Sequence, residues 1–468
     1  MQDKDPPLWL PHLAPHSGPR FLQIADALHT AVADGLLKPG DRLPPQRLLA
    51  ARLRVDLTTV TRAYDEARRR NLLEGRGARG TYVAAPKVEL NPVLDLSMNT
   101  PPPTGDVDFD DLMKQGLSQV LMRANAQLLM TYHLGGGSDA DRTAGTQWLE
   151  PMFGPLETQQ VVVCPGAQAA IAAVILALTA PGDVILAEPM SYPGLRTAAT
   201  QLGRRIVTVG TDEHGMRPEI LEQACHRHQP RLLYLNPTLQ NPTAVTMPEH
   251  RRKELANIAR CCNLRIIEDD PYWLLADAPP SPIGTWAPEQ VVYICTLSKS
   301  LTPGLRVAFV LIHDAQERER FLVALRSFAL MVAPLAAALA TQWIFDGSAK
   351  RLMEGIRQEA RLRHTMARGI LAGRYSGAGD GLHVWLELPG YWTPTQLVHA
   401  AETAGIVVTP AEAFAMEAGA GGESLNPSLS SIRISLGSIP DRSRLQAALQ
   451  RLSDLLAQRP EPFGKAVV

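Results

Sequence analysis

The sequence predicts two domains of different class, a small mainly α domain and a larger α/β domain that ends in a smaller α/β subdomain. Apolar residues recur at helical spacing from Ile24 to Val32 and again after Gln46. Prolines crowd the stretch from Ala84 to Asp110, and beyond it apolar runs alternate with helical patterns, which is typical of a parallel sheet with crossover helices. With 468 residues, 45% apolar and 20% charged, the chain is long enough for two or three globular domains.

The charge is unevenly distributed, although the formal net charge is only -1. From Arg42 to Gly80 the chain carries ten arginines and four acidic residues, a local net charge of +6 (10 − 4). Such a segment indicates an anionic partner, for example nucleic acid. Arginine outnumbers lysine across the whole chain, so this signal is weak when taken alone.

The N-terminus and the cysteines indicate a cytoplasmic protein without a membrane partner. Residues 1–10 carry acids and prolines and lack the basic and apolar regions of a signal peptide, and no apolar run reaches membrane-spanning length. The five cysteines lack the spacing of a metal site, and the adjacent pair Cys261 and Cys262 cannot easily bridge to itself. We therefore expect buried, reduced thiols and no metal centre.

The first domain is predicted to be a winged helix-turn-helix. A helix containing Ile24 ends near Gly35, a short helix covers Gln46–Leu53, and a third covers Leu57–Asn71. The tight turn between the last two makes a helix-turn-helix, whose second helix enters the DNA major groove. Residues 72–83 then predict two strands around a tip of glycine and arginine, which forms a wing.

Arginines and threonines of this domain are the candidates for contacts with double-stranded DNA. Arginines hold phosphates, which position a protein on the duplex, whereas side chains at the start of the third helix reach base edges. The alternative is a solvated basic helical bundle that binds no DNA. The candidates are Arg42, Arg47, Thr58, Thr59, Arg62, Arg76 and Arg79.

Residues 18–84 resemble the GntR winged-helix family of transcriptional regulators. The resemblance is carried by Ile24–Leu28, Leu37–Pro44, Thr59–Tyr64 and Gly80–Val83. It implies binding to operator DNA. The chain departs from the family pattern at Pro45, Arg54, Asp56 and Leu57. The departure at Leu57 removes a recognition-helix arginine, which bears on base contacts more than on the fold.

Lys299 is the first candidate for chemistry in the larger domain. It follows the apolar run 291–294, a predicted buried strand, and lies near Thr296, Ser298 and Arg306. A lysine amine can form a Schiff base with an aldehyde cofactor, and the hydroxyls and the guanidinium can donate to a phosphate. The alternative is a surface lysine in a turn.

Two further polar clusters come directly after predicted strands. The strand at 266–267 leads into Asp269 and Tyr272, and the strand at 232–235 leads towards Asn241. A carboxylate at the carboxyl end of a parallel strand lies where α/β sheets bind ligands, and at Asp269 it can keep a pyridine nitrogen protonated. Tyr272 and Asn241 can reach the phenolic oxygen of the same cofactor.

Together the three clusters resemble the fold-type I pyridoxal phosphate (PLP) aminotransferases. The resemblance is carried by Asn241–Thr243, Glu268–Tyr272, Ser298–Lys299 and Gly304–Arg306. It implies a fold-type I α/β domain with PLP bound at Lys299. It also implies that an N-terminal loop, here about Asp95–Pro103, crosses the site.

More cofactor contacts follow from this resemblance. A strand at 161–163 runs into a glycine turn that can present backbone N–H groups to an anion, and the family holds the PLP phosphate there. Tyr192 is expected to stack on the pyridine ring, the alternative being an ordinary loop tyrosine. Tyr132 is expected to reach the phosphate in the partner subunit. The turn consists of Gly166, Ala167 and Gln168.

Arg433 lies between apolar neighbours on the predicted strand at 431–436. A charge on a buried strand must be paired or functional. Its guanidinium suits a bidentate grip on a carboxylate, and the position matches the substrate arginine of the aminotransferases. The alternative is an internal salt bridge.

The succession of domains resembles the MocR subfamily of GntR regulators. We expect a DNA-binding domain at 18–84, a semi-rigid proline-rich linker at 85–110 and a PLP domain at 111–460, with its small subdomain at about 350–460. The resemblance implies a homodimer, often with exchanged domains.

The predicted function is a PLP-dependent transcriptional regulator that senses an amine or amino acid through an aldimine at Lys299. One alternative is an active aminotransferase with an accessory DNA-binding domain, because the groups for transamination are present. The other is a PLP-binding protein without DNA affinity. The effector, the operator, and the choice between activation and repression do not follow from the sequence.

Overall fold

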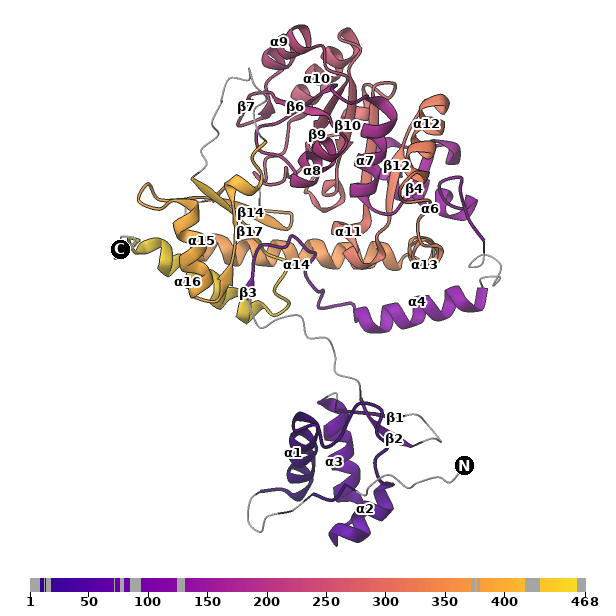
Figure 1. Cartoon of the computed structure of the whole chain (residues 1–468), viewed down its shortest axis with the longest axis vertical. Coiled ribbons are helices and arrows are strands. Elements are labelled where there is room, and N and C mark those ends of the chain that lie inside the picture. The colour runs from indigo at the N-terminus through magenta and orange to yellow at the C-terminus, as the bar shows by residue number, and fades with distance from the viewer. Residues whose placement is uncertain are drawn as a thin grey trace. The chain divides into compact units, whose positions relative to one another are not determined.

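The computed structural model describes residues 9–11, 13, 18–70, 72–75, 80–84, 94–123, 131–371, 375–376, 379–416 and 430–460. It divides the chain into two compact units, Met1–Pro92 and Val93–Val468 (Figure 1). Two candidate DNA contacts, Arg76 and Arg79, lie outside the described residues.

The first unit is the predicted winged helix-turn-helix. Its helices are α1 (Arg20–Ala33), α2 (Gln46–Leu53) and α3 (Leu57–Arg69), and its antiparallel wing strands are β1 (Leu73–Gly75) and β2 (Thr81–Val83). The helices bury Ile24, Leu28, Leu49, Val60 and Tyr64. The buried Tyr64 hydroxyl donates to the Pro44 carbonyl oxygen at 2.9 Å, and this bond ties α3 to the segment before α2.

A seven-stranded mixed sheet forms the centre of the second unit, in the order β4-β12-β11-β10-β9-β5-β6. β12 is antiparallel to both neighbours, and the other pairs are parallel, so six strands point the same way. The strands are β4 (Val161–Cys164), β5 (Val184–Ala187), β6 (Arg205–Thr208), β9 (Leu232–Leu235), β10 (Arg265–Asp269), β11 (Val291–Thr296) and β12 (Ala308–Leu311).

Helices cover both faces of this sheet, because its fully buried strands present apolar side chains alternately to either side. Ile185, Ile267 and Val292 belong to one buried apolar cluster, and Leu186, Ile266 and Val291 to the other. The helices of this part are α4 (Phe109–Arg123), α6 (Asp139–Phe153), α7 (Ala167–Leu178), α8 (Pro193–Gln201), α9 (Pro218–His228), α10 (Glu249–Cys261), α11 (Leu297–Ser300), α12 (Ala315–Arg326) and α13 (Pro334–Phe345).

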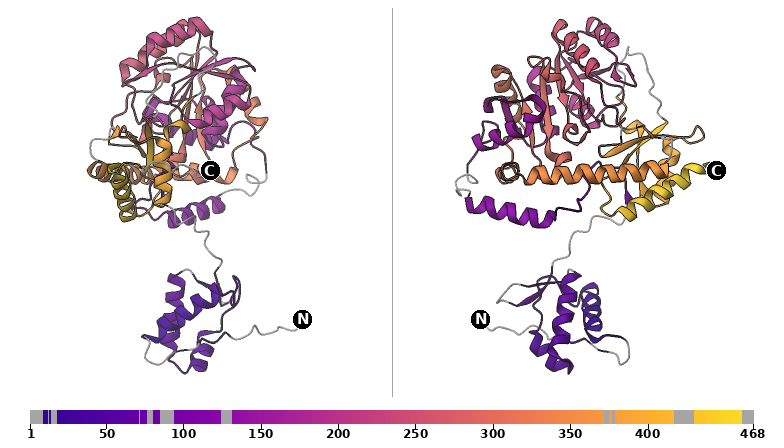
Figure 2. Two further views of the ribbon diagram at one scale, coloured as in Figure 1. Left: turned by 60° about the vertical axis from the view of Figure 1, so that its left-hand side comes forward. Right: turned by 180° about the vertical axis from the view of Figure 1, so that it is seen from behind.

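A smaller subdomain follows the long helix α14 (Ser348–Leu371), which runs past both parts of the second unit (Figure 2). Its four-stranded sheet has the order β13-β14-β17-β16 and packs on α15 (Pro394–Thr403) and α16 (Arg442–Ala457) through a separate apolar core. Its strands are β13 (Tyr375–Ser376), β14 (His383–Glu387), β16 (Thr409–Pro410) and β17 (Ser431–Ser435). The short pair β7 (Thr211–Asp212) and β8 (Gly215–Met216) forms a hairpin in the larger part.

Residues 94–110, expected to belong to the proline-rich linker, instead form part of the second unit. β3 (Leu94–Asp95) pairs in parallel with β15 (Ile406–Val407), and the backbone N–H of Ser435 donates to the Leu96 carbonyl oxygen at 2.7 Å. At Gly437 an added Cβ would lie 1.8 Å from the carbonyl oxygen of Thr100, so the segment packs directly on this backbone. Composition indicates a spacer, but strand partners far along the chain satisfy the backbone of this segment.

Within the described residues, no helix is both long and apolar enough to cross a bilayer. The cysteines are free thiols, of which Cys164, Cys225 and Cys295 are buried. The expectation of buried thiols is wrong for Cys261, which is exposed, because it ends α10 at the surface.

Candidate functional site

A cavity of about 530 Å³ opens at the carboxyl ends of the sheet strands and is closed on one side by the small subdomain. It brings together most of the predicted cofactor residues. These are Ala167, Gln168, Tyr192, Asn241, Asp269, Tyr272, Thr296, Ser298, Lys299, Arg306 and Arg433. The position agrees with the rule that α/β sheets bind ligands beyond the carboxyl ends of their strands.

Lys299 lies on the single turn α11, directly after the buried strand β11. The Thr296 hydroxyl caps this turn by accepting from the backbone N–H of Ser298 at 3.2 Å. The Lys299 amine donates to the main-chain oxygen of Asn99. Burial, together with the positive charge of Arg433, lowers the pKa of the lysine to about 8. The neutral, nucleophilic form of the amine is therefore far more populated near neutral pH than for an ordinary lysine.

Asp269 is the last residue of β10, and its carboxylate faces the cavity. The Tyr234 hydroxyl donates to Oδ2 at 2.7 Å, whereas the buried Oδ1 has no partner among the described residues. Burial raises the pKa of this carboxyl to about 7. A cationic ring nitrogen placed at Oδ1 would supply the missing partner and restore the ionised form.

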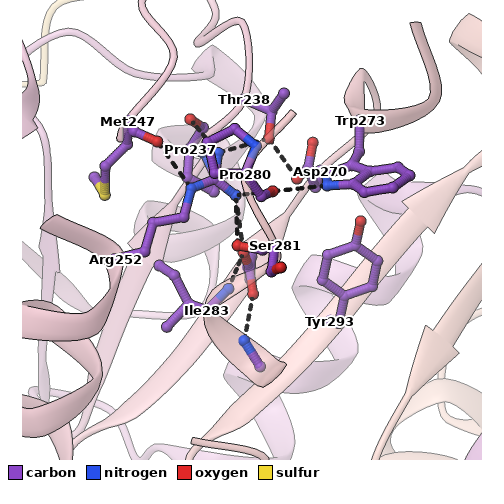
Figure 3. Close-up of polar contacts among 12 residues, drawn as sticks. Pro237, Thr238, Met247, Arg252, Asp270, Trp273, Pro280, Ser281, Ile283 and Tyr293 are labelled. Carbon is purple, nitrogen blue, oxygen red and sulfur yellow. Dashed lines mark hydrogen bonds and ion pairs between the residues drawn. The ribbon is translucent and has the colours of Figure 1, made fainter. Parts of the chain in front are cut away.

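The neighbouring carboxyls, Glu268 and Asp270, are buried and belong to a separate network of polar contacts, in which Figure 3 labels Asp270. Thr238 donates to Asp270 at 2.7 Å, and the backbone N–H groups of Ile283 and Gly284 donate to Glu268. This alternation follows from the strand period of two residues. Asp270 does not line the cavity, so Asp269 is the cavity-facing carboxylate of the pair.

Arg252 closes this network and holds the loop that follows β9 (Figure 3). Its guanidinium is fully buried and donates to the carbonyl oxygens of Met247 at 2.9 Å and Pro237 at 3.0 Å, and to the Thr238 hydroxyl at 3.0 Å. The loop carries Asn241, whose side chain lines the cavity. Arg252 therefore shapes the cavity wall without touching its interior.

The glycine turn and Arg306 are adjacent. Gly166 has φ +87°, and an added Cβ would lie 2.6 Å from Nη2 of Arg306, so only glycine leaves the guanidinium in place. Gly166 caps α7, whose N-terminus presents free N–H groups. Thr296 and Ser298 add hydroxyls on the cavity wall. Helix N-terminus, guanidinium and hydroxyls are the donors that a phosphate needs.

Tyr192 and Gln168 complete this side of the cavity. Tyr192 lies directly before α8 and lines the cavity, as does Gln168, whose Nε2 donates to the Gly194 carbonyl oxygen at 3.0 Å. An added Cβ at Gly194 would lie 2.3 Å from the Tyr192 ring, so the turn keeps this ring closely packed. Tyr132 is 73% exposed and does not line the cavity of its own chain. Its contact with a partner subunit stays a prediction.

Arg433 lies on β17 at the small-subdomain side of the cavity, only 7% exposed. Nη1 donates to Oδ1 of Asn241 at 2.7 Å, Nη2 donates to the Ser97 carbonyl oxygen, and the guanidinium carbon lies 4.8 Å from the centre of the Phe414 ring. Among the described residues no carboxylate forms an ion pair with it, and its Nε has no partner. The internal salt bridge considered as an alternative is therefore not observed.

Several cavity residues escaped the sequence analysis. Tyr234 is part of an apolar strand and reads as core, and Asn236 precedes the Asn241 motif. The side chain of Asn236 donates to the main-chain oxygen of Asp269 at 2.6 Å. For Tyr234 and Asn236, the only sequence signal of a place in the cavity is their position near the carboxyl end of a strand. Val408, Thr409 and Phe414 come from distant segments and have no local signal, whereas Ser97, Met98 and Asn99 belong to the loop at about 95–103 expected to cross the site.

In the first unit, Arg42, Arg47, Thr58 and Arg62 are exposed and Thr59 is half-buried. Arg62 stacks on the Phe21 ring of α1, with its guanidinium carbon 4.2 Å from the ring centre. Arg54 ends α2 in the left-handed conformation with φ +52°, and it forms the tight turn that leads to α3.

Comparison with known families matches both units. The family model of aminotransferase class I and II matches residues 91–452, and that of the gntR family of bacterial regulatory proteins matches residues 21–83. The chain belongs to the class I and II aminotransferase family. With a GntR domain before the aminotransferase domain, the chain has the domain arrangement of the MocR subfamily. The GntR domain implies DNA binding.

Relatives that match most of this chain carry regulator names. The uncharacterized HTH-type transcriptional regulator YdeF of Bacillus subtilis is 30% identical over 417 residues, covering 87% of this chain and 90% of YdeF. The vitamin B6 salvage pathway transcriptional repressor PtsJ of Salmonella typhimurium is 28% identical over 409 residues, covering 85% of this chain and 91% of PtsJ.

Solved structures of aminotransferases resemble the second unit. LysN, the alpha-aminoadipate aminotransferase of Thermus thermophilus, was solved with N-(5'-phosphopyridoxyl)-L-leucine; it is 25% identical, has a TM-score of 0.69, and covers 78% of this chain and 92% of its own. Kynurenine aminotransferase of Pyrococcus horikoshii shares the fold with a TM-score of 0.69 at 23% identity, covering 79% and 92%. The family implies PLP as cofactor.

The cavity fits PLP. The orphaned Oδ1 of Asp269 suits the pyridine nitrogen, and the Gly166 turn with Arg306 suits the phosphate. Lys299 lines the same cavity, and its amine has a lowered pKa of about 8. Each end of the cofactor thus has a chemically matched group.

We predict that apo protein reacts with PLP at a rate that rises through pH about 8, because only the neutral amine of Lys299 attacks an aldehyde. The increase in visible absorbance against pH measures this. Borohydride reduction should leave a covalent adduct that is lost in Lys299→Ala and kept in the exposed control Lys253→Ala. An adduct in Lys299→Ala, or a rise centred near 10.5, would contradict the assignment.

We predict that Asp269→Asn weakens PLP binding by roughly 10- to 1,000-fold, because the ring nitrogen loses its charged partner. Equilibrium titration of apo protein with PLP measures the effect. The matched control is Asp270→Asn, whose carboxyl bonds to Thr238 away from the cavity and whose loss should lower thermal stability instead. A larger loss of PLP affinity in Asp270→Asn would show that the two roles are reversed.

Proposed function

We propose that this chain is a PLP-dependent transcriptional regulator that binds operator DNA through residues 18–84 and senses a primary amine or amino acid at Lys299. The observation that supports sensing is the segment 97–99, which lies between the linker and the rest of the second unit in sequence. Its Ser97 and Asn99 carbonyl oxygens accept from Arg433 and Lys299, the two groups that an amino acid would engage.

The segment is also fixed to the small subdomain. β3 pairs with β15, and the Ser438 hydroxyl donates to the Asp95 carbonyl oxygen. A ligand that takes over the bonds of Lys299 and Arg433 must therefore change the contacts of a segment continuous with the DNA-binding domain. A ligand shifts a conformational equilibrium only through such differential contacts.

The geometry of the cavity supports one role for each of three residues. Bound PLP supplies an aldehyde that links reversibly to amines and a ring that withdraws electrons. Lys299 holds the aldehyde and is the group an incoming amine replaces. Asp269 keeps the ring nitrogen protonated, and Arg433 orients a carboxylate on the small-subdomain side. We therefore propose an effector with both an amine and a carboxylate.

A homodimer is part of the proposal. Tyr132 has most of its surface exposed and does not reach the cavity of its own chain, which supports a contact with the partner's cofactor phosphate. Two winged helices in one dimer would match a two-fold operator.

Catalytic turnover is the second candidate. Lys299, Asp269 and Arg433 all line one cavity, as transamination requires, and a relative at 28% identity over 348 residues is the 2-aminoadipate transaminase of Thermus thermophilus. Release of a keto acid on incubation with amino acids separates the two. Sensing alone predicts a spectral change on adding an amino acid, with no more keto acid released than there is protein.

We predict that DNA affinity falls steeply with salt and that Arg47→Ala weakens binding to all sequences alike, lowering the slope of log affinity against log salt by about one. Thr58→Ala should change the preference between sequences instead. Fluorescence anisotropy with DNA from upstream of its own gene and with unrelated DNA measures both. The exposed control Arg444→Ala, in the second unit, should leave both unchanged. Equal loss of sequence preference in Arg47→Ala and Thr58→Ala would reject this division.

We predict that Arg433→Met weakens amino acids by roughly 10- to 1,000-fold and leaves simple amines nearly unaffected, since one or two charge-assisted hydrogen bonds are lost and the Ser97 contact is no longer displaced. Spectral titration of PLP-loaded protein measures affinity, and a mobility-shift assay with and without PLP and each ligand reports the effect on DNA. Arg444→Met is the control. Unchanged amino-acid titrations would make Arg433 structural, and a DNA complex insensitive to every ligand would reject sensing.

A further inference from the structure

A hydrogen-bonded chain lies behind Tyr272, outside the groups assigned so far. The side-chain nitrogen of Asn99 is 2.8 Å from the Tyr272 hydroxyl and 3.0 Å from Nδ1 of His383 on β14. Tyr272 and His383 are each 1% exposed and Asn99 is 6% exposed, and the two rings lie 5.6 Å apart. Residues from three distant segments therefore meet at one amide.

The direction of each bond in this chain follows from a single carbonyl. Nε2 of His383 lies 3.2 Å from the Gln240 carbonyl oxygen, which can only accept, so Nε2 carries the proton. Burial, assisted by Arg433, lowers the pKa of His383 to about 3, and the ring is therefore neutral. Its Nδ1 is then an acceptor, and the group facing it must be the N–H side of the Asn99 amide.

The same amide nitrogen has a second N–H, which points to the Tyr272 oxygen. Tyr272 thus accepts from Asn99 and keeps its own proton for another acceptor. Among the described residues none accepts that proton, and Tyr272 lines the cavity. Asn99 also binds the Lys299 amine through its main-chain oxygen, so one residue contacts both sides of the cofactor linkage.

We propose that Asn99, oriented by His383, is a positioning residue that fixes the Tyr272 hydroxyl as a hydrogen-bond donor to the phenolic oxygen of bound PLP. This inference rests on the proposed PLP site. Without His383 the amide is free to turn, and its unpaired Oδ1 would then accept the Tyr272 proton. A donor on the phenolic oxygen withdraws negative charge from beside the Schiff-base nitrogen of Lys299, and the pKa of that nitrogen is lower for it.

The test is a pH titration of the visible absorption of PLP-loaded protein. His383→Phe keeps a ring beside Tyr272 and removes the acceptor for Asn99. It should raise the Schiff-base pKa by about one to two units, and Tyr272→Phe should do the same. The matched control is His364→Phe, another buried histidine of the second unit, which bonds to the Gly381 carbonyl oxygen and does not line the cavity. Its Schiff-base pKa should equal that of the wild type.

A double variant separates positioning from general damage. In a Tyr272→Phe background, His383→Phe should cause no further shift, because the effect passes through the missing hydroxyl. The charged groups Asp269, Arg306 and Arg433 remain in every variant. A full additional shift in the double variant, or no shift in His383→Phe alone, would overturn the proposal.

A measurement on unloaded wild-type protein covers the case in which a variant fails to fold. Nitrogen-15 histidine spectra should show His383 neutral with the proton on Nε2, and a proton on Nδ1 would overturn the proposed order of bonds. If wild type forms no Schiff-base band, the PLP site itself fails. If instead the band forms normally but its pKa is the same in His383→Phe as in wild type, only the role proposed for His383 fails.

Discussion

The burial of charge at the carboxyl ends of β10 and β11 is the constraint on which the rest of the second unit depends. Asp269 and Lys299 are both removed from water on folding. Burial favours the neutral form of each, so it raises the pKa of Asp269 to about 7 and lowers the pKa of Lys299 to about 8. A buried carboxylate oxygen without a partner costs free energy, about 1–3 kcal/mol or more for a charged group. A cationic ring nitrogen at the unpartnered Oδ1 of Asp269 would offset this cost.

Three buried arginines show how the same side chain serves structure or ligand binding. Arg252 and Arg363 are at most 1% exposed and donate to several carbonyl oxygens each, and Arg363 also pairs with Glu359 at 2.7 Å. They fix loops that carry cavity residues or close the small subdomain. Arg433 has an unpartnered Nε and bonds only to neutral oxygens. The Asp95 carboxylate acts on this charge only without a direct ion pair, so the guanidinium keeps donor capacity for an anion.

The segment 94–100 links these features. It adds β3 to the small subdomain, passes the closely packed Gly437, and ends on Lys299, Tyr272 and His383 through Asn99. Its backbone carbonyls occupy the donors of Lys299 and Arg433, while its chain leads back to the linker. The small subdomain and the side chains of Lys299 and Arg433 thus share contacts with one short stretch of chain.

The sequence by itself determined the local structure. The buried strands, the helix-turn-helix with its wing, and the residues at strand ends, among them Asp269, Lys299 and Gly166, follow from apolar periodicity and from polar residues placed directly after it. Such features depend on neighbours in the chain. Only the tertiary structure decided that residues 94–95 pair as β3 with β15 in the small subdomain, and that the Asn99 side chain meets His383 and Tyr272. These depend on contacts between segments hundreds of residues apart, which no local pattern encodes.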